Sequence, residues 1–182
     1  MSRLPFPGRD DLKPEDRPIY DRLIAERPQP TPHIFRVVAN APKLLGSFIS
    51  YGGDLRHKTV LSPRLRELAI MTVGQAANIK YEIVHHTAYA KAAGVTQAQI
   101  ENLDHFRTSE LFPPIDKAVM QYAKEATLGV NVADETWTAV RSFLSEQEAT
   151  ELVLNVAWYV AATRVIGPLK IEIEEFMHCL NE

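Results

Sequence analysis

From Pro42 onward the chain is a succession of apolar segments bounded by helix start and stop signals, and this pattern constrains the fold most. In Leu61-Ser62-Pro63, the Ser62 side chain can accept a hydrogen bond from a backbone amide of the first helical turn, and Pro63 takes the first helical position. Gly94 provides a stop where a left-handed cap costs little. Because no segment alternates apolar and polar residues over a strand's length, the sequence predicts an all-α fold. The predicted helices cover about 14–27, 42–56, 62–77, 80–94, a short stretch from 96, 113–129, a stretch capped by Asp134, and 145–166 ending at Gly167-Pro168.

Prolines are concentrated near the N-terminus, since only four of the 12 follow Pro42. Proline lacks the N–H of a helix interior, so residues 1–41 are predicted to be a Pro-rich arm. This arm is predicted to hold one short helix and an extended linker over 28–32. Residues 42–182 are predicted to form a single-domain helical bundle around a helical hairpin.

Composition narrows the functional classes. The chain has 20 basic and 23 acidic residues, a net charge of −3, and no basic run, so we expect no nucleic-acid partner. The most apolar stretch, 152–162, has about 11 residues and includes Asn155, whereas a membrane span needs about 20. No signal-peptide apolar region follows Arg3. We therefore expect a cytoplasmic protein with no membrane partner.

The most informative region for chemistry is 61–94, which holds Glu67, Glu82, His85 and His86. If two antiparallel helices meet at a turn near residue 78, Glu67 lies about 16 Å before the turn and His86 about 12 Å after it. Glu82 and His86 are four residues apart and share one helix face, while His85 points about 100° away. The spacing predicts that Glu67, Glu82 and His86 converge.

Such a set suits acid/base chemistry. Imidazole titrates near pH 6.5, and an apolar wall can raise the pKa of a glutamate toward the same range. The alternative is ordinary helix chemistry, in which Glu82 and His86 form a solvated pair and Glu67 is an early-helix acid favoured by the helix dipole.

The residues of this region also resemble the core of the carboxymuconolactone decarboxylase and alkylhydroperoxidase D-like superfamily. The residues that carry the resemblance are Leu61-Ser62-Pro63-Arg64, Glu67, Tyr81-Glu82, His86, Ala90 and Ala93-Gly94-Val95. The resemblance extends over residues 42–167. It implies a small all-α fold around a helical hairpin, and a homo-oligomer, commonly a trimer or hexamer, with sites near subunit interfaces. The apolar segment 152–160 would then contact another subunit or serve as a central core helix.

In the peroxidase branch of the superfamily, the resemblance implies a relay of a glutamate, a C-x-x-C pair and a histidine. By spacing, the glutamate falls on Glu67, the histidine on His86, and the two cysteines on Ile79 and Glu82. Neither of the last two is a thiol, and the single cysteine, Cys179, matches no position of the motif. We therefore expect no dithiol peroxidase cycle.

The decarboxylase branch implies cofactor-free loss of CO₂ from a small carboxylated lactone formed in aromatic-acid breakdown. His86 would be the proton donor, Glu67 its orienting partner, and Glu82 a second base or a polar contact to substrate. The predicted substrate-binding residues are Ile79, Tyr81 and His85. An arginine should anchor the substrate carboxylate. The candidates for it are Arg36, Arg64, Arg66 and Arg164.

Two other classes remain open. The first is a metal-binding helical protein, because Glu82-Ile83-Val84-His85 and Glu175-Phe176-Met177-His178 both have the E-x-x-H spacing of di-iron bundles. The second is a non-catalytic oligomeric member of the superfamily that keeps the fold. The favoured prediction is an enzyme that uses no metal and no cofactor.

Overall fold

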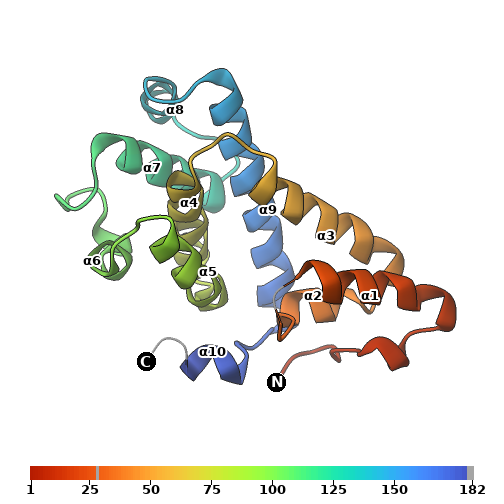
Figure 1. The fold of residues 1–182 in the computed structure, drawn as a ribbon. Helices are drawn as coiled ribbons and strands as arrows, with labels where there is room; N and C mark the ends of the chain where they lie inside the picture. Colours follow the sequence, from red (N-terminus) through yellow and green to blue (C-terminus); the bar gives the residue numbers. More distant parts are fainter. Residues whose placement is uncertain (28, 180–182) are drawn as a thin grey trace. The chain divides into compact units, whose positions relative to one another are not determined.

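The computed structural model describes residues 1–27 and 29–179, and every regular element in these ranges is helical (Figure 1). The predicted all-α class is confirmed. By contacts, the chain forms two compact units, residues 1–58 with 165–182 (unit 1) and residues 59–164 (unit 2). The boundary predicted after residue 41 rests on proline content and stays a prediction.

Unit 1 joins the N-terminal segment to the C-terminal end of the chain. Its helices are α1 (Arg17–Glu26), α2 (His33–Val38), α3 (Pro42–His57) and α10 (Glu175–Cys179), with 3₁₀ turns at Arg9–Asp11 and Pro14–Asp16. Apolar side chains from the arm, α1 and α3 form its core, and the buried members are Leu12, Tyr20, Leu23, Ala39, Leu45 and Ile49. The Arg3 amide donates to the Leu169 carbonyl at 2.9 Å, which ties the two ends of the chain together.

Helix α2 was not predicted, because the prolines before it favour an extended segment. In the structure the buried carboxylate of Glu174 accepts a bond from the His33 amide at 2.5 Å. The amides of Phe35 and Arg36 donate to the Pro32 carbonyl. A residue far along the sequence thus satisfies the start of this short helix, and local pattern cannot reveal such support.

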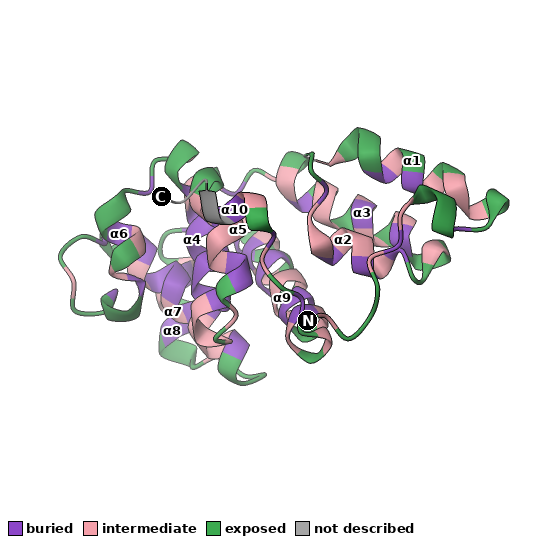
Figure 2. Ribbon diagram, turned by 90° about the horizontal axis from the view of Figure 1, so that it is seen from below, coloured by how far each residue is buried: buried purple, intermediate pink, exposed green. Residues whose placement is uncertain are grey.

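Unit 2 is organised around α4 (Pro63–Ala76), which forms a hairpin with α5 (Lys80–Ala92). One side of α4 carries Leu65, Ala69 and Val73 and packs in a core shared with α7, α8 and α9. Another side carries Leu68 and Met71 and packs in a second core, which includes Phe106 and Phe112. Figure 2 shows the buried residues gathered on α4 and its neighbours. The remaining helices here are α6 (Gln97–Glu101), α7 (Pro114–Leu128), α8 (Asp134–Arg141) and α9 (Glu146–Leu169), which runs on into unit 1, with a 3₁₀ turn at Leu103–His105.

Several predicted caps are confirmed. Thr96 and Gln99 exchange side-chain and backbone bonds in a capping box. Ser145 and Glu148 do the same at the start of α9. Gly94 has φ 90°, the left-handed conformation that a glycine adopts at little cost.

Three boundary predictions are wrong. The Ser62 side chain makes no cap bond with α4. Asp134 is the first residue of α8 rather than its cap, because Ala133 precedes it and donates its amide to the Glu125 carboxylate at 2.9 Å. Helix α9 continues through Gly167-Pro168 to Leu169, and it ends only where Lys170 takes φ 51°.

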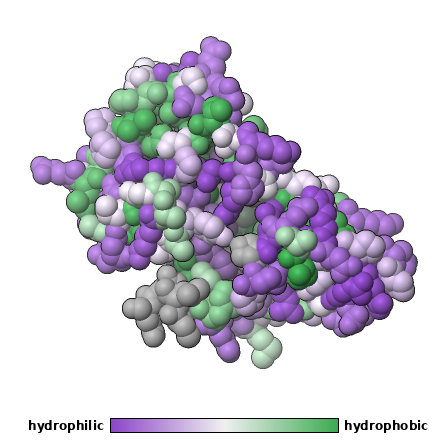
Figure 3. Space-filling model, viewed as in Figure 1, coloured by the Kyte–Doolittle hydropathy of each residue, from purple (hydrophilic) through white to green (hydrophobic). Residues whose placement is uncertain are grey.

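Helix α9 is long and apolar enough to cross a membrane by length and composition alone. Core helices of soluble proteins pass the same test, and the buried Leu152 and Val156 pack in the core of unit 2. On the face drawn in Figure 3, hydrophobic residues occur in separate groups among hydrophilic ones. The expectation of no membrane partner stays a prediction.

Candidate functional site

The hairpin brings the three predicted catalytic side chains together in the interior of unit 2. Glu67 lies in the second turn of α4, and Glu82 and His86 lie in successive turns of α5. They are 1%, 4% and 5% exposed. The turn between the helices uses Asn78 with φ 55°, and the Ile79 amide donates to the Gly74 carbonyl at 2.8 Å. The predicted convergence is therefore present, while the catalytic roles stay a prediction.

His86 has a carboxyl group near each ring nitrogen. Its Nδ1 is 2.7 Å from Oε2 of Glu67, and its Nε2 is 3.7 Å from Oε2 of Glu82. The first distance is a hydrogen bond, whereas the second is too long for one. A carboxylate at Nδ1 favours the tautomer with its proton on that nitrogen, so Nε2 is left as the acceptor on the side of Glu82. We call Glu67, Glu82 and His86 the hairpin cluster.

Burial has a large effect on the pKa of Glu82. Desolvation, and secondly the nearby charge of Glu67, raise the pKa of Glu82 to about 8. The side chain is therefore predominantly a neutral carboxylic acid at neutral pH. A carboxylic acid can donate a proton that a carboxylate cannot.

Arg66, Tyr89 and Tyr159 border the hairpin cluster, and the Tyr89 and His86 ring centroids are 5.8 Å apart. The Arg66 guanidinium lies 3.4 Å from Oε1 of Glu67 and its side chain is 12% exposed. The Tyr159 ring of α9 meets the His86 ring edge-on, with centroids 5.0 Å apart. Sequence reasoning named Arg66 only as one of four arginines and missed Tyr159, because nothing local indicates a contact across 73 residues.

A glycine allows the close approach of the two helices. A Cβ on Gly74 would lie 2.9 Å from the Glu82 Cβ and 3.3 Å from the Ile79 carbonyl oxygen. Both are too close for an ordinary contact, and neither atom belongs to the flexible end of a side chain. The signal in the sequence was a glycine inside an apolar helix, which is typical of close packing.

The predicted substrate-binding residues lie at the start of α5 and on its first two turns. Tyr81 is buried and stacks on His85, with ring centroids 4.2 Å apart and an interplanar angle of 25°. Ile79 is half-buried and precedes the first turn of the helix. Tyr81 and His85 thus form an aromatic pair, and the substrate-binding role of all three stays a prediction.

Among the four arginine candidates, Arg66 is the one beside the hairpin cluster. Arg64 makes two bonds of 2.5 and 2.7 Å with Asp116, a fully buried carboxylate. Arg36 belongs to unit 1, and Arg164 is exposed on α9. The pairing of Arg64 with a buried carboxylate indicates a structural role, and which arginine anchors a substrate carboxylate stays a prediction.

The di-iron alternative gains no support from the described part of the chain. Within it, no group of three or more His, Cys, Asp and Glu side chains is arranged to hold a metal ion. The side chains of His178 and Cys179 lie outside the described residues. The prediction that no metal is used stays a prediction.

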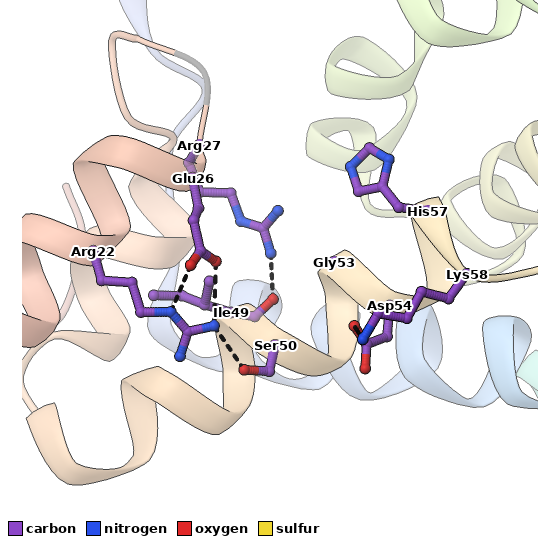
Figure 4. Close-up of a pocket in the computed structure, with 9 residues that line it drawn as sticks. All are labelled: Arg22, Glu26, Arg27, Ile49, Ser50, Gly53, Asp54, His57 and Lys58. Carbon is purple, nitrogen blue, oxygen red and sulfur yellow. Dashed lines mark hydrogen bonds and ion pairs between the residues drawn. The ribbon is translucent and has the colours of Figure 1, made fainter.

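A second concentration of charge lines a cavity of about 460 Å³ between α1 and α3 in unit 1 (Figure 4). Arg22 bonds to Glu26 at 2.7 Å and to Ser50 at 2.8 Å, and Lys58 pairs with Asp54 at 2.8 Å. These charges neutralise one another within the wall of the cavity. We call them the α1–α3 cluster.

Structural comparison supports the fold independently of sequence. The debrominase Bmp8 is 18% identical with a TM-score of 0.77, covering 95% of this chain and 92% of that one. An uncharacterized peroxidase-related protein from Ralstonia eutropha JMP134, described as an alkylhydroperoxidase AhpD core, is 18% identical with a TM-score of 0.79, covering 97% and 94%. At such identities the likeness shows the fold alone.

Sequence comparison finds relatives of part of the chain. The uncharacterized protein YdfG of Bacillus subtilis (strain 168) is 29% identical over 93 residues, which cover 50% of this chain and 63% of that protein. The match thus spans less than two thirds of that relative. Residues 42–125 match the carboxymuconolactone decarboxylase family, and this segment contains the whole hairpin cluster. The segment 42–125 is therefore similar to the carboxymuconolactone decarboxylase family, and the chain shares its fold with the alkylhydroperoxidase AhpD core.

Proposed function

We propose that this protein is an enzyme for cofactor-free acid/base chemistry on a small carboxylated substrate, with decarboxylation of an unsaturated lactone as the leading reaction. The observation that carries the proposal is the buried His86, bonded to Glu67 through Nδ1 and facing Glu82 from Nε2. A buried histidine between two carboxyl groups of different protonation can both accept and deliver a proton.

Each polar group has a role in this chemistry. Arg66 anchors a carboxylate of the substrate, since guanidinium groups bind carboxylates in a fixed geometry. Glu67 orients the His86 ring. Glu82, protonated at neutral pH, supplies a proton to Nε2 of His86, and His86 returns it to the substrate ring after CO₂ is lost. The net reaction takes up one proton for each CO₂ released, and water resupplies Glu82.

A dithiol peroxidase is not part of the proposal. That cycle needs an attacking and a resolving thiol, and the two corresponding positions hold Ile79 and Glu82. The replacement of the second thiol by a carboxyl group with a raised pKa supports acid/base chemistry at the same place.

The test is turnover by the purified full chain and its H86Q, E67Q and E82Q variants. The substrates are a carboxylated unsaturated lactone, a hydroperoxide and 2,3,4-tribromopyrrole, the compound found in one Bmp8 structure. Decarboxylation is expected in the wild type, with a loss of about 10²–10⁴-fold in kcat for H86Q, since that is the usual contribution of a positioned general acid or base. E67Q and E82Q should each lose at least about tenfold.

The matched control is H105Q, which removes an exposed histidine of the same unit and should keep full activity. Equal turnover in wild type, H86Q and E67Q would show that the hairpin cluster takes no part in catalysis. Absence of turnover of every substrate by the wild type would favour the non-catalytic alternative. Turnover of the hydroperoxide or the tribromopyrrole alone would contradict the decarboxylase assignment.

A further inference from the structure

Asn155 of α9 is a buried amide without a hydrogen-bond partner among the described residues. The side chain is 2% exposed, and both Oδ1 and Nδ2 are fully covered and unbonded. Its surroundings on the helix are apolar, because Leu152 and Val156 beside it pack in the core of unit 2. An amide held there loses its bonds to water and gains none in return.

Other buried polar side chains of unit 2 avoid this penalty. The hydroxyl groups of Thr72, Thr127 and Thr163 each donate to a carbonyl of the preceding helical turn, at 2.7, 2.6 and 2.7 Å. The buried Asp116 has Arg64. Compared with these bonded side chains, Asn155 is unusual because neither polar atom of its amide has a hydrogen-bond partner among the described residues.

Its position on α9 suggests one. Asn155 and Tyr159 are four residues apart, so they share a helix face. The Tyr159 ring contacts the His86 ring, and helical side chains lean toward the N-terminus, over the preceding turn. Asn155 therefore lies one helical turn before Tyr159, the residue of α9 that contacts the hairpin cluster.

We propose that the Asn155 amide is a substrate-binding group that donates an Nδ2–H bond to the carbonyl oxygen of the lactone. The inference rests on the proposed function and deepens it, because it names the chemistry recognised: a planar ring with a carbonyl or enolate oxygen. The carbonyl needs a donor, and a buried amide supplies one that is already oriented.

The donor matters most during bond cleavage. As the bond from the ring carbon to the carboxylate carbon breaks, its electron pair enters the ring and negative charge reaches the lactone oxygen. CO₂ leaves, the Asn155 N–H stabilises the enolate oxygen, and a proton from Glu82 then reaches the ring carbon through His86 and restores the carbonyl. Glu82 regains its proton from water, so atoms and charge balance.

The experiment compares wild type with N155L, which replaces the amide by an apolar side chain of similar shape, and with T163V as the matched control. Thr163 is buried on the same helix and already bonded. Turnover of the carboxylated lactone is measured together with binding of tetronate, a planar lactone enolate anion, by calorimetry. Asn155 N–H signals of labelled wild type are followed by NMR during the same titration.

For N155L we expect kcat to fall by about 10²-fold, the usual effect of losing one oxyanion donor, and tetronate to bind at least about tenfold more weakly. Its Tm should not fall, because an unbonded amide has been removed. T163V should keep kcat and tetronate affinity. The Asn155 N–H signals of wild type should shift on tetronate addition, a readout that does not require N155L to fold.

The two proposals fail in different ways. If N155L keeps kcat and tetronate affinity while H86Q loses activity, the Asn155 assignment is overturned and the enzyme assignment stands. If wild type turns nothing over but binds tetronate through Asn155, the decarboxylase is overturned and the binding role stands. Absence of both turnover and tetronate binding, with no NMR shift, overturns both.

Discussion

The hairpin cluster and the α1–α3 cluster use the same kinds of side chain to opposite effect. In the hairpin cluster, the side chains of Glu67 and His86 are 2% and 7% exposed. In the α1–α3 cluster, those of Arg22 and Glu26 are 39% and 45% exposed. Both contain hydrogen-bonded pairs of acid and base, so pairing alone does not distinguish a reactive site from a solvated one.

The glutamates show the difference directly. In the α1–α3 cluster, the hydrogen bond from Arg22 lowers the pKa of Glu26 below its usual value, so its charge is stabilised. In the hairpin cluster, burial and secondly the charge of Glu67 raise the pKa of Glu82 to about 8, and the Arg66 guanidinium pairs with Glu67 rather than with Glu82. Burial without a cation of its own converts a glutamate from a charge carrier into a proton donor.

The largest expected loss of stability concerns a third arrangement, in which the buried carboxylate of Asp116 is paired with Arg64. Replacing Arg64 by Met should leave Asp116 buried and unpaired, and should lower the free energy of unfolding by about 3–5 kcal/mol. Urea denaturation measures the change. R22M, which breaks an exposed pair in the α1–α3 cluster, should cost no more than about 1 kcal/mol. Equal losses in the two variants would show that burial does not separate these pairs.

The second prediction concerns the stability of the E82Q variant as pH changes. The folded pKa of Glu82 lies above its unfolded value, so the native state binds more protons than the unfolded state between about pH 4.5 and pH 8. Wild-type stability should therefore fall as pH rises through this window. Relative to E82Q, the loss should be roughly 3 kcal/mol from about pH 5.5 to 7.5, at about 1.4 kcal/mol for each unit.

Chemical denaturation of both proteins at several pH values tests this prediction. E26Q serves as the matched variant from the α1–α3 cluster, and its stability should follow wild type closely across the same pH range. A wild-type curve parallel to that of E82Q would contradict a proton held on Glu82.

The hairpin cluster was predictable because the number of residues between each side chain and the turn gives its height along the helix. Two helices that meet near Asn78 place Glu67 and His86 at one level, and the rise of 1.5 Å per residue suffices to see it. The capping boxes at Thr96 and Ser145 were predictable for a similar reason, since each lies within four residues of sequence.

Contacts between residues far apart along the chain could not be predicted from the sequence. Tyr159 reaches His86 from another helix, and Glu174 satisfies the start of α2 from the opposite end of the sequence. The pairing of Arg64 with Asp116 depends in the same way on the packing of α4 against α7. Burial of Glu82, and hence its protonation, depends on the packing of α5 against α4.

The third prediction asks whether close packing of α4 on α5 maintains the hairpin cluster. G74A places a Cβ 2.9 Å from that of Glu82, so α5 must shift, and the free energy of unfolding should fall by about 1–3 kcal/mol despite the better helix propensity of alanine. The matched change in unit 1 is G53A, whose Cβ would lie 3.5 Å from the Arg27 guanidinium, an ordinary contact.

G53A should therefore gain about 0.5–1 kcal/mol, as a helical glycine replaced by alanine does where there is room. Urea denaturation gives both changes, and the activity of G74A gives a second readout, because a shift of α5 moves His86 away from Glu67. If G74A is as stable and active as G53A, then the spacing of α4 and α5 tolerates an added methyl group.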